Sequence, residues 1–288
     1  MTLSVSPAEF MASTPAPTGG NSPWASGYGY DLRDVIVRQA HRQPRSVQRH
    51  LGPSELGSPC PRQIVSKLCG PGVASYTNHV ADPWPSVVGT AVHAQLAQFF
   101  ENENQLNGTK RWYTETRVHP HPLYPGTSDV YDAVEKCVTD WKIQGPTSMA
   151  KIRSREGPSR QYKAQVLLYA WGWRNAGFEV ERVALASMPR TASRLSEMYL
   201  WDHWITPEDD AKVIEILQQT EARRWVAQQI LNRTMTIGMV PRTPGGDECY
   251  FCGYFRAEAA RDGDHEHGCP GHSAPADWPA GVPYPPAA

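Results

Sequence analysis

Residues 126–142, GTSDVYDAVEKCVTDWK, decide the fold of this chain. Two segments with the composition of β-strands fall here, Thr127–Ala133 and Lys136–Ile143, the second ending one residue beyond the stretch, and the connection between them is short enough for a hairpin. Further strands are expected on both sides of this hairpin, at Trp112–His119, Arg182–Met188 and Met198–Trp204.

Helical patterns bracket these strands. A helix over Val87–Glu101 is expected after a capping Ser86, and a second over Arg160–Ala176. A third begins at Thr206-Pro207-Glu208-Asp209, which supplies a capping Thr, a Pro at the first helical position and acids in the first turn. Strands between helices predict an α/β domain around a mixed sheet. The apolar stripe of the first helix is expected to consist of Val88, Val92, Leu96 and Phe99.

The hairpin carries side chains that suit metal-dependent chemistry. Side chains two apart on a strand share a face, so Asp140 and Lys142 point the same way while Trp141 points oppositely. A suitable register brings Asp129 beside Asp140, and two adjacent carboxylates repel each other unless a cation lies between them. Mg²⁺ or Mn²⁺ suits such ligands and activates water for phosphodiester hydrolysis, and Lys142 can stabilise developing negative charge. A solvent-facing polar strand would carry the same residues.

Three residues outside the hairpin extend this set. His93 ends the segment Gly89-Thr90-Ala91-Val92-His93, in which the glycine would let another backbone approach the helix and the imidazole could add a nitrogen ligand. Gln165 and Tyr169 lie four apart on one helix face and could hold a phosphate or a terminal base. The alternatives are a hydrogen-bonded histidine at the edge of the core and an ordinary amphipathic helix.

The cysteines form a second pattern. Cys249 and Cys252 have a spacing at which two thiolates bind one centre, and Cys269 follows after 16 intervening residues. With Cys60 as a fourth ligand, the set suits zinc or a [4Fe–4S] cluster. With a histidine in place of Cys60, it suits zinc, the candidates being His265, His267 and His272.

The chain resembles the RecB-like branch of the PD-(D/E)XK nuclease superfamily over about residues 50–272. The resemblance rests on the ordered motifs Gly89-xxx-His93, Gly126-Thr127-Ser128-Asp129, Asp140-Trp141-Lys142 and Gln165-xxx-Tyr169. With the flanking cysteines, the chain is most similar to the iron–sulfur CRISPR-associated and phage-encoded exonucleases and to the nuclease domain of AddB. In one departure, Gly-Thr-Ser-Asp stands where the family's name has proline–aspartate, with Pro125 displaced upstream.

This resemblance implies a restriction-endonuclease-like α/β core, with a mixed central β-sheet flanked by helices and the chain ends joined by an iron–sulfur cluster. It implies that Lys142 is catalytic and that Gln165 and Tyr169 position DNA. It also implies two ligand sets. Mg²⁺ or Mn²⁺ would be bound by His93, Asp129, Asp140 and the backbone carbonyl of Trp141, and the [4Fe–4S] cluster by Cys60, Cys249, Cys252 and Cys269.

The implied activity is that of a single-strand-preferring DNA exonuclease in replication, recombination or repair. Its substrate would be DNA that is single-stranded or has free ends, and its partner a replication or recombination protein. Two alternatives stay open: an endonuclease or junction resolvase on the same core, and a zinc-containing DNA-binding protein without nuclease activity.

Composition and charge set the outer limits. Residues 1–30 are expected to form a disordered leader and residues 273–288 a Pro-rich tail, leaving 31–272 as the nuclease domain. The net charge of −1 requires any DNA-binding surface to be local. The basic loop with Lys151, Arg153 and Arg155 is the candidate, although a solvated loop would have the same composition.

The expected location is cytoplasmic, which for a phage-encoded enzyme means the host cytoplasm. No apolar run approaches the roughly 20 residues that span a bilayer, so no membrane partner is expected. The N-terminus lacks the pattern of a secretion signal. In the cytosol the six cysteines are expected to be ligands or free thiols rather than disulfides.

Overall fold

The computed structural model describes residues 27–42, 50–70, 73, 83–242, 249, 252–255, 268, 269 and 271. The chain divides into two compact units, Met1–Gln48 and Arg49–Ala288. The described part of the first unit is helix α2 (Gly27–Arg42), and all other described elements belong to the second unit. Within the described residues, no helix is both long and apolar enough to cross a membrane.

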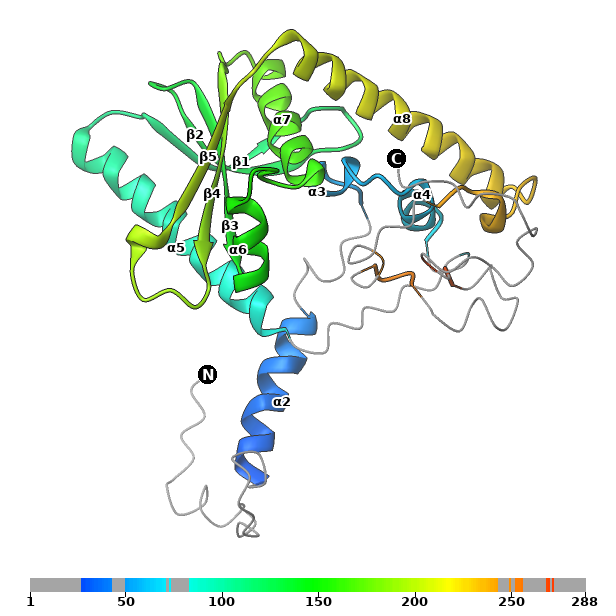
Figure 1. Cartoon of the computed structure of the whole chain (residues 1–288), viewed down its shortest axis with the longest axis horizontal. Helices are drawn as coiled ribbons and strands as arrows, with labels where there is room; N and C mark the ends of the chain where they lie inside the picture. Colours follow the sequence, from blue (N-terminus) through cyan, green and yellow to red (C-terminus); the bar gives the residue numbers. More distant parts are fainter. Residues whose placement is uncertain are drawn as a thin grey trace, which may run out of the picture. The chain divides into compact units, whose positions relative to one another are not determined.

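A five-stranded sheet in the order β1-β2-β3-β4-β5 forms the centre of the second unit (Figure 1). Neighbouring strands are antiparallel except β3 and β4, which are parallel. A parallel pair needs a crossover connection, and helices α6 (Pro146–Arg153) and α7 (Arg160–Asn175) supply it. The expected mixed α/β class and its five strands are thereby confirmed: β1 (Trp112–Val118), β2 (Gly126–Asp132), β3 (Cys137–Gln144), β4 (Arg182–Pro189) and β5 (Tyr199–Trp204).

Helices cover both faces of the sheet. Phe100 of α5 (Trp84–Asn107) contacts Trp112 of β1, whereas Trp173 of α7 contacts Tyr113, the next residue of β1. Because consecutive strand residues point to opposite sides, α5 and α7 lie on opposite faces. Trp141 of β3 stacks on Phe100, as its predicted orientation away from Asp140 requires.

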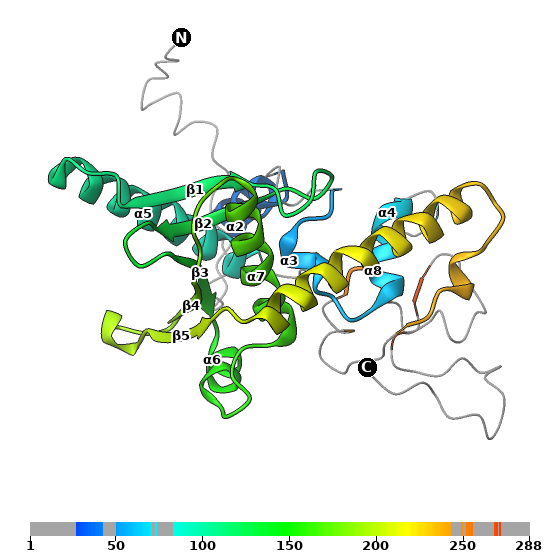
Figure 2. The ribbon, with the colours of Figure 1, turned by 90° about the horizontal axis from the view of Figure 1, so that it is seen from above.

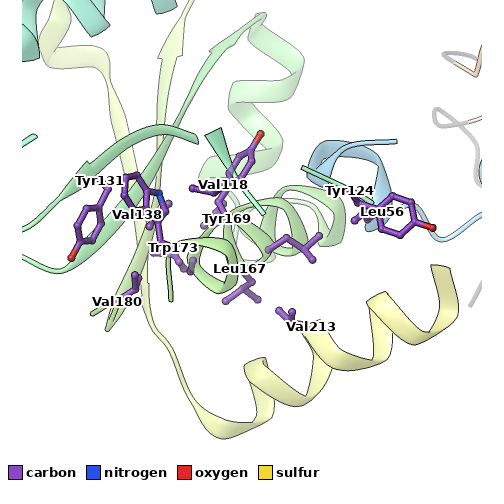
Figure 3. Close-up of a cluster of buried hydrophobic side chains, with 14 of the residues drawn as sticks. Leu56, Val118, Tyr124, Tyr131, Val138, Leu167, Tyr169, Trp173, Val180 and Val213 are labelled. Carbon is purple, nitrogen blue, oxygen red and sulfur yellow. The ribbon is translucent and has the colours of Figure 1, made fainter. Parts of the chain in front are cut away.

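The main core lies between α7 and the sheet and extends to α8 (Pro207–Leu231) (Figure 3). Trp173 is 1% exposed, and its Nε1 donates a hydrogen bond of 3.1 Å to Ser128 Oγ. Leu56 of α3 (Pro53–Leu56) and Val213 of α8 belong to the same cluster. Each large apolar side chain buried there contributes about 1.5–3 kcal/mol of transfer free energy.

A smaller core joins the two ends of the second unit. Helix α4 (Pro61–Cys69) packs on α8, and Figure 2 shows α4 alongside the C-terminal half of α8. The guanidinium of Arg62 donates two hydrogen bonds, of 3.1 and 2.6 Å, to the carbonyl of Ile237 in the short helix η3 (Ile237–Met239). The buried residues of this core are Val65, Ala227, Ile230, Ile237 and Val240.

Helix boundaries follow the sequence signals with one correction. The predicted start of α8 is confirmed, because Asp209 Oδ2 accepts hydrogen bonds from the amide and the hydroxyl of Thr206. Helix α5 instead begins at Trp84, with Pro83 rather than Ser86 at its cap. Its expected stripe is wrong at Phe99, which is 58% exposed, because Phe100 makes the contact with the sheet.

Candidate functional site

Asp129 lies where strands β2 and β3 separate. Their ladder ends at the pair Val130–Thr139, just before Asp129. Asp129 Oδ2 accepts a 2.7 Å hydrogen bond from the amide of Trp141, so the carboxylate replaces a ladder acceptor. Its Oδ1 lies 3.3 Å from Nδ1 of His93 on α5. The carboxylate is thus fixed by the backbone, with one oxygen directed at the imidazole.

Asp140, on the next strand, is held by an ion pair and an amide. It is 2% exposed, and its Oδ2 lies 2.6 Å from Nζ of Lys142. No described residue gives that oxygen a well-directed hydrogen bond. Gln165 of α7 bridges the pair, because its Nε2 donates to Asp140 Oδ1 at 2.9 Å and its Oε1 accepts from Lys142 Nζ at 3.0 Å. Lys142 also lies over the ring of Tyr162, 4.8 Å from its centroid.

The pKa shifts at this site follow from burial and crowded charge. Burial raises the pKa of Asp140 to about 6, with Lys142 opposing and Asp129 adding to the shift. Burial alone would lower the pKa of Lys142, but the charge and hydrogen bond of Asp140, together with Asp129 and Tyr162, outweigh it, so the net pKa lies above its usual range. Burial also lowers the pKa of His93, and the contacts with Asp129 and the charge of Asp140 outweigh it, again raising the net pKa. The site concentrates negative charge that a cation would neutralise.

The raised pKa of Asp140 predicts a pH dependence of stability without divalent metal. A carboxyl with a higher pKa in the folded than in the unfolded state holds its proton longer when folded, so stability falls as pH rises between the two values. A rise from 3.8 to about 6 corresponds to about 3 kcal/mol. We expect wild type to lose up to this much relative to Asp140→Asn between about pH 4 and pH 6, measured by urea unfolding in chelator. Parallel profiles of the two proteins would contradict it.

The structure brings together His93, Asp129, Asp140 and Lys142, with Gln165 beside them. Tyr169 lies next to Gln165, whose Nε2 is 3.4 Å from the phenol oxygen, and both side chains are buried. Their contacts with DNA, like metal binding by the carbonyl of Trp141, stay predictions. Among the described residues, a Cβ on Gly89 would meet no atom within 4 Å, so the close backbone approach expected at this glycine is not found there.

The first part of the basic segment after β3 is a helix rather than the expected loop, whereas Arg155 lies in the turn that follows it. Pro146 occupies the first turn of α6, and Met149 and Ile152 bury one face of it, which holds the segment helical. Lys151 and Arg153 lie in its last turn, and Arg153 donates a 2.6 Å hydrogen bond to the carbonyl of Glu197, beside the 3₁₀ turn η2 (Leu195–Glu197). Their side chains and that of Arg155, two residues further on, are exposed.

One residue of the site was missed by the sequence interpretation. The ligand atoms of His93, Glu115 and Asp129 all lie within 4.8 Å of one another, a geometry that can hold a metal ion. Glu115 lies in β1 and has a φ of 44°, which is rare for a residue with a side chain. This set contains two of the predicted ligands, His93 and Asp129, and adds a carboxylate that the motifs did not include.

Four cysteines line a second site. Cys60 caps the N-terminus of α4, and it lines the same cavity as Cys249, Cys252 and Cys269. The amide of Cys252 donates to the carbonyl of Cys249 at 3.0 Å, which folds this pair into a tight turn. Burial, aided by the charges of the other three cysteines, raises the pKa of the Cys252 thiol to about 11.

Backbone contacts hold the two ends of the unit around this cavity. The amide of Arg62 donates to the carbonyl of Pro241 at 3.1 Å, and that of Cys269 to the carbonyl of Tyr254 at 2.8 Å. Gly271 has a φ of 65°, and a Cβ there would lie 2.6 Å from the ring of Phe255, so this position requires glycine. The histidines of the zinc alternative, His265, His267 and His272, lie outside the described residues.

Comparison with known proteins finds distant structural neighbours. No family model and no curated protein matches the chain. A phage related exonuclease from Haemophilus somnus 129PT is 13% identical with a TM-score of 0.38, over 52% of this chain and 73% of that one. An alkaline exonuclease (LHK-Exo) from Laribacter hongkongensis is 8% identical with a TM-score of 0.34, over 49% and 73% of the two chains.

Proposed function

We propose that this protein is a divalent-metal-dependent deoxyribonuclease with a restriction-endonuclease-like core, and that it acts as an exonuclease on single strands or free ends. The observation that carries the proposal is the ion pair of buried Asp140 with partly buried Lys142, next to Asp129 and His93. Burying two charges costs several kcal/mol per ion unless their surroundings compensate, so a site that concentrates them is a candidate for chemistry.

The donor atoms fit a hard divalent cation. Asp129 presents Oδ1 to His93, and Asp140 Oδ2 is a buried oxygen without a well-directed hydrogen bond among the described residues. Carboxylate oxygens suit Mg²⁺ and Mn²⁺, and an added imidazole favours Mn²⁺ of the two. Such an ion would supply Lewis acidity toward a phosphate oxygen and toward the attacking water.

Side chains of the protein would supply the remaining parts of the reaction, namely charge stabilisation and positioning. Water adds to phosphorus and gives up a proton, one P–O bond breaks with its electron pair, and the leaving oxygen takes up a proton. Lys142 places positive charge beside the phosphate that gains negative charge in the transition state. Gln165 fixes the geometry of that lysine and of Asp140 through two hydrogen bonds, which makes it a positioning residue in addition to its predicted DNA contact.

We propose that the four cysteines hold a [4Fe–4S] cluster. Four thiols from two distant segments line one cavity, and such a donor set suits a cluster or zinc. Cys60 belongs to this set, which favours a centre of four thiolates over one completed by a histidine. Iron and zinc contents of the purified protein, with absorbance near ~400 nm, separate the two metals.

The direct test of the proposed activity is cleavage of end-labelled DNA. Linear single-stranded, linear double-stranded and circular DNA are incubated with the full chain in Mg²⁺, Mn²⁺ or chelator. We expect metal-dependent release of nucleotides from linear substrates, fastest on single strands, and no cutting of circles. Cleavage of circular DNA would favour an endonuclease, and no cleavage under any condition would refute the nuclease proposal.

Lys142→Ala is expected to reduce turnover by about 10²-fold or more at saturating metal, with little change in metal affinity. The reason is that Lys142 acts on the transition-state charge rather than on the ion. Lys212→Ala is the matched control, because it also removes a lysine paired with an aspartate, Asp209, but on the surface of α8. Normal turnover with weakened Mn²⁺ binding in Lys142→Ala would assign the lysine a different role.

A further inference from the structure

The regular alternation of side chains between the two faces of the sheet is interrupted at one position in each of the neighbouring strands β1 and β2. In β2, Tyr131 packs on Trp173 and Ser128 accepts a hydrogen bond from the same Trp173. Residues three apart on a regular strand point to opposite faces, yet these two meet one side chain of α7. The alternation of β2 is therefore broken between them, at the level of Asp129.

Strand β1 shows the same break. Tyr113 contacts Trp173, while Val118 lies against Gly172, where a Cβ would be 3.0 Å from that of Val118. These residues are five apart and should also face opposite sides. The position between them with a left-handed backbone is Glu115, with φ of 44°, and it lies opposite Asp129 between the pairs Thr114–Val130 and Thr116–Ser128.

This interruption of the alternation places the side chain of Glu115 at the proposed metal site. Its carboxylate lies within 4.8 Å of the ligand atoms of both His93 and Asp129. Glu115 is exposed, whereas Asp129 is buried. Glu115 therefore reaches the shared point from the solvent side, and Asp129 reaches it from within the sheet. A left-handed backbone costs a residue with a Cβ about 1–2 kcal/mol, and such strain is concentrated at functional sites.

A second observation, on the neighbouring carboxylate of Asp140, also points to an ion near Asp129 and His93. Asp140, 2% exposed, keeps its Oδ2 without a well-directed hydrogen bond among the described residues, with Lys142 as its charged neighbour. Asp140 lies near Asp129 and His93, whose charges act on it, but it is not one of the three residues whose ligand atoms lie within 4.8 Å of one another. Close carboxylates repel each other, and a divalent cation relieves that repulsion.

We infer that Glu115 is a ligand of the catalytic divalent cation, together with His93 and Asp129. Its left-handed backbone conformation directs the carboxylate toward that ion. The inference rests on the proposed function, because it names a further ligand of that metal site. The nitrogen and two carboxylates suit Mn²⁺ better than Mg²⁺.

Two substitutions at this position separate the ligand role from a structural one. Glu115→Gln keeps the shape and removes the charge. Glu115→Gly removes the carboxylate but adopts the positive φ without the cost of a Cβ. Glu103→Gln on α5, an exposed glutamate whose Oε1 accepts a hydrogen bond from Asn107, is the matched control. Mn²⁺ binding is measured by calorimetry on the full chain without DNA, and thermal stability is measured in chelator.

We expect Glu115→Gln and Glu115→Gly to weaken Mn²⁺ binding at least about tenfold, with Glu103→Gln unchanged. The Tm of Glu115→Gly in chelator should equal or exceed that of wild type, so stability and metal affinity move in different directions. Wild-type Mn²⁺ affinity in both variants would overturn this inference alone, provided that wild type binds the ion and cleaves DNA. A wild-type protein that neither binds Mn²⁺ nor cleaves DNA would overturn the proposed function as well.

Discussion

Asp129→Asn and Asp140→Asn are each expected to abolish metal-dependent cleavage while the fold persists. Each substitution removes a carboxylate charge from the proposed metal site, and the loss of several kcal/mol of transition-state stabilisation corresponds to about 10³-fold or more in rate. The asparagine side chain keeps an oxygen for the amide of Trp141 in the first variant and for Gln165 in the second. Single-turnover cleavage of labelled single-stranded DNA in Mg²⁺ and Mn²⁺ measures the effect.

Asp132→Asn is the matched control for these two variants. Asp132 also lies in β2 and is 6% exposed, but its carboxylate pairs with Arg111 at 2.7 Å, away from His93 and Lys142. We expect Asp132→Asn to lower the free energy of unfolding and to leave turnover of the folded protein unchanged. Substantial cleavage by Asp129→Asn or Asp140→Asn would show that the catalytic assignment is wrong.

Cys60→Ser is expected to lose iron and solubility as severely as Cys249→Ser or Cys252→Ser. Cys60 precedes Cys249 by 189 positions, so a centre that joins them closes a long loop of the unfolded chain. For a loop of that length the chain-entropy model gives about 5 kcal/mol for a permanent cross-link. Metal content per chain, absorbance near ~400 nm and the Tm of each variant measure the loss.

Cys69→Ala controls for the loss of a thiol from the same helix. Cys60 caps the start of α4 and Cys69 ends it, where the thiol donates to the carbonyl of Ala227 at 3.7 Å. This variant should keep its full iron content. If Cys60→Ser keeps its metal while His265→Ala or His272→Ala loses it, the centre is a zinc site completed by a histidine.

Local signals were sufficient for the elements that position the site. The alternation around Asp140, Trp141 and Lys142 predicted which side chains share a face, because strand geometry allows little else. The start of α8 followed from its capping residues, since Thr206 and Asp209 satisfy backbone groups within one turn.

Features that depend on distant contacts could not be predicted. The left-handed conformation of Glu115 has no local signal, because the segment Thr114-Glu115-Thr116 has the composition of an ordinary strand. The bridge from Gln165 to Lys142 joins residues 23 apart, and only the packing of α7 on β3 sets its distance. Phe99 and Phe100 are equally apolar, so composition does not decide which one meets the sheet.

The cavity lined by the four cysteines also has a consequence for the order in which its ligands are synthesised. Cys269 leaves the ribosome 209 positions after Cys60, which takes roughly 10 to 40 s at typical rates of elongation. All five strands, β1 through β5, are made within that interval. The five-stranded sheet can therefore be complete before the last thiol is synthesised. If the proposed cluster forms, its assembly is then a late step that follows folding of the sheet carrying the proposed metal site.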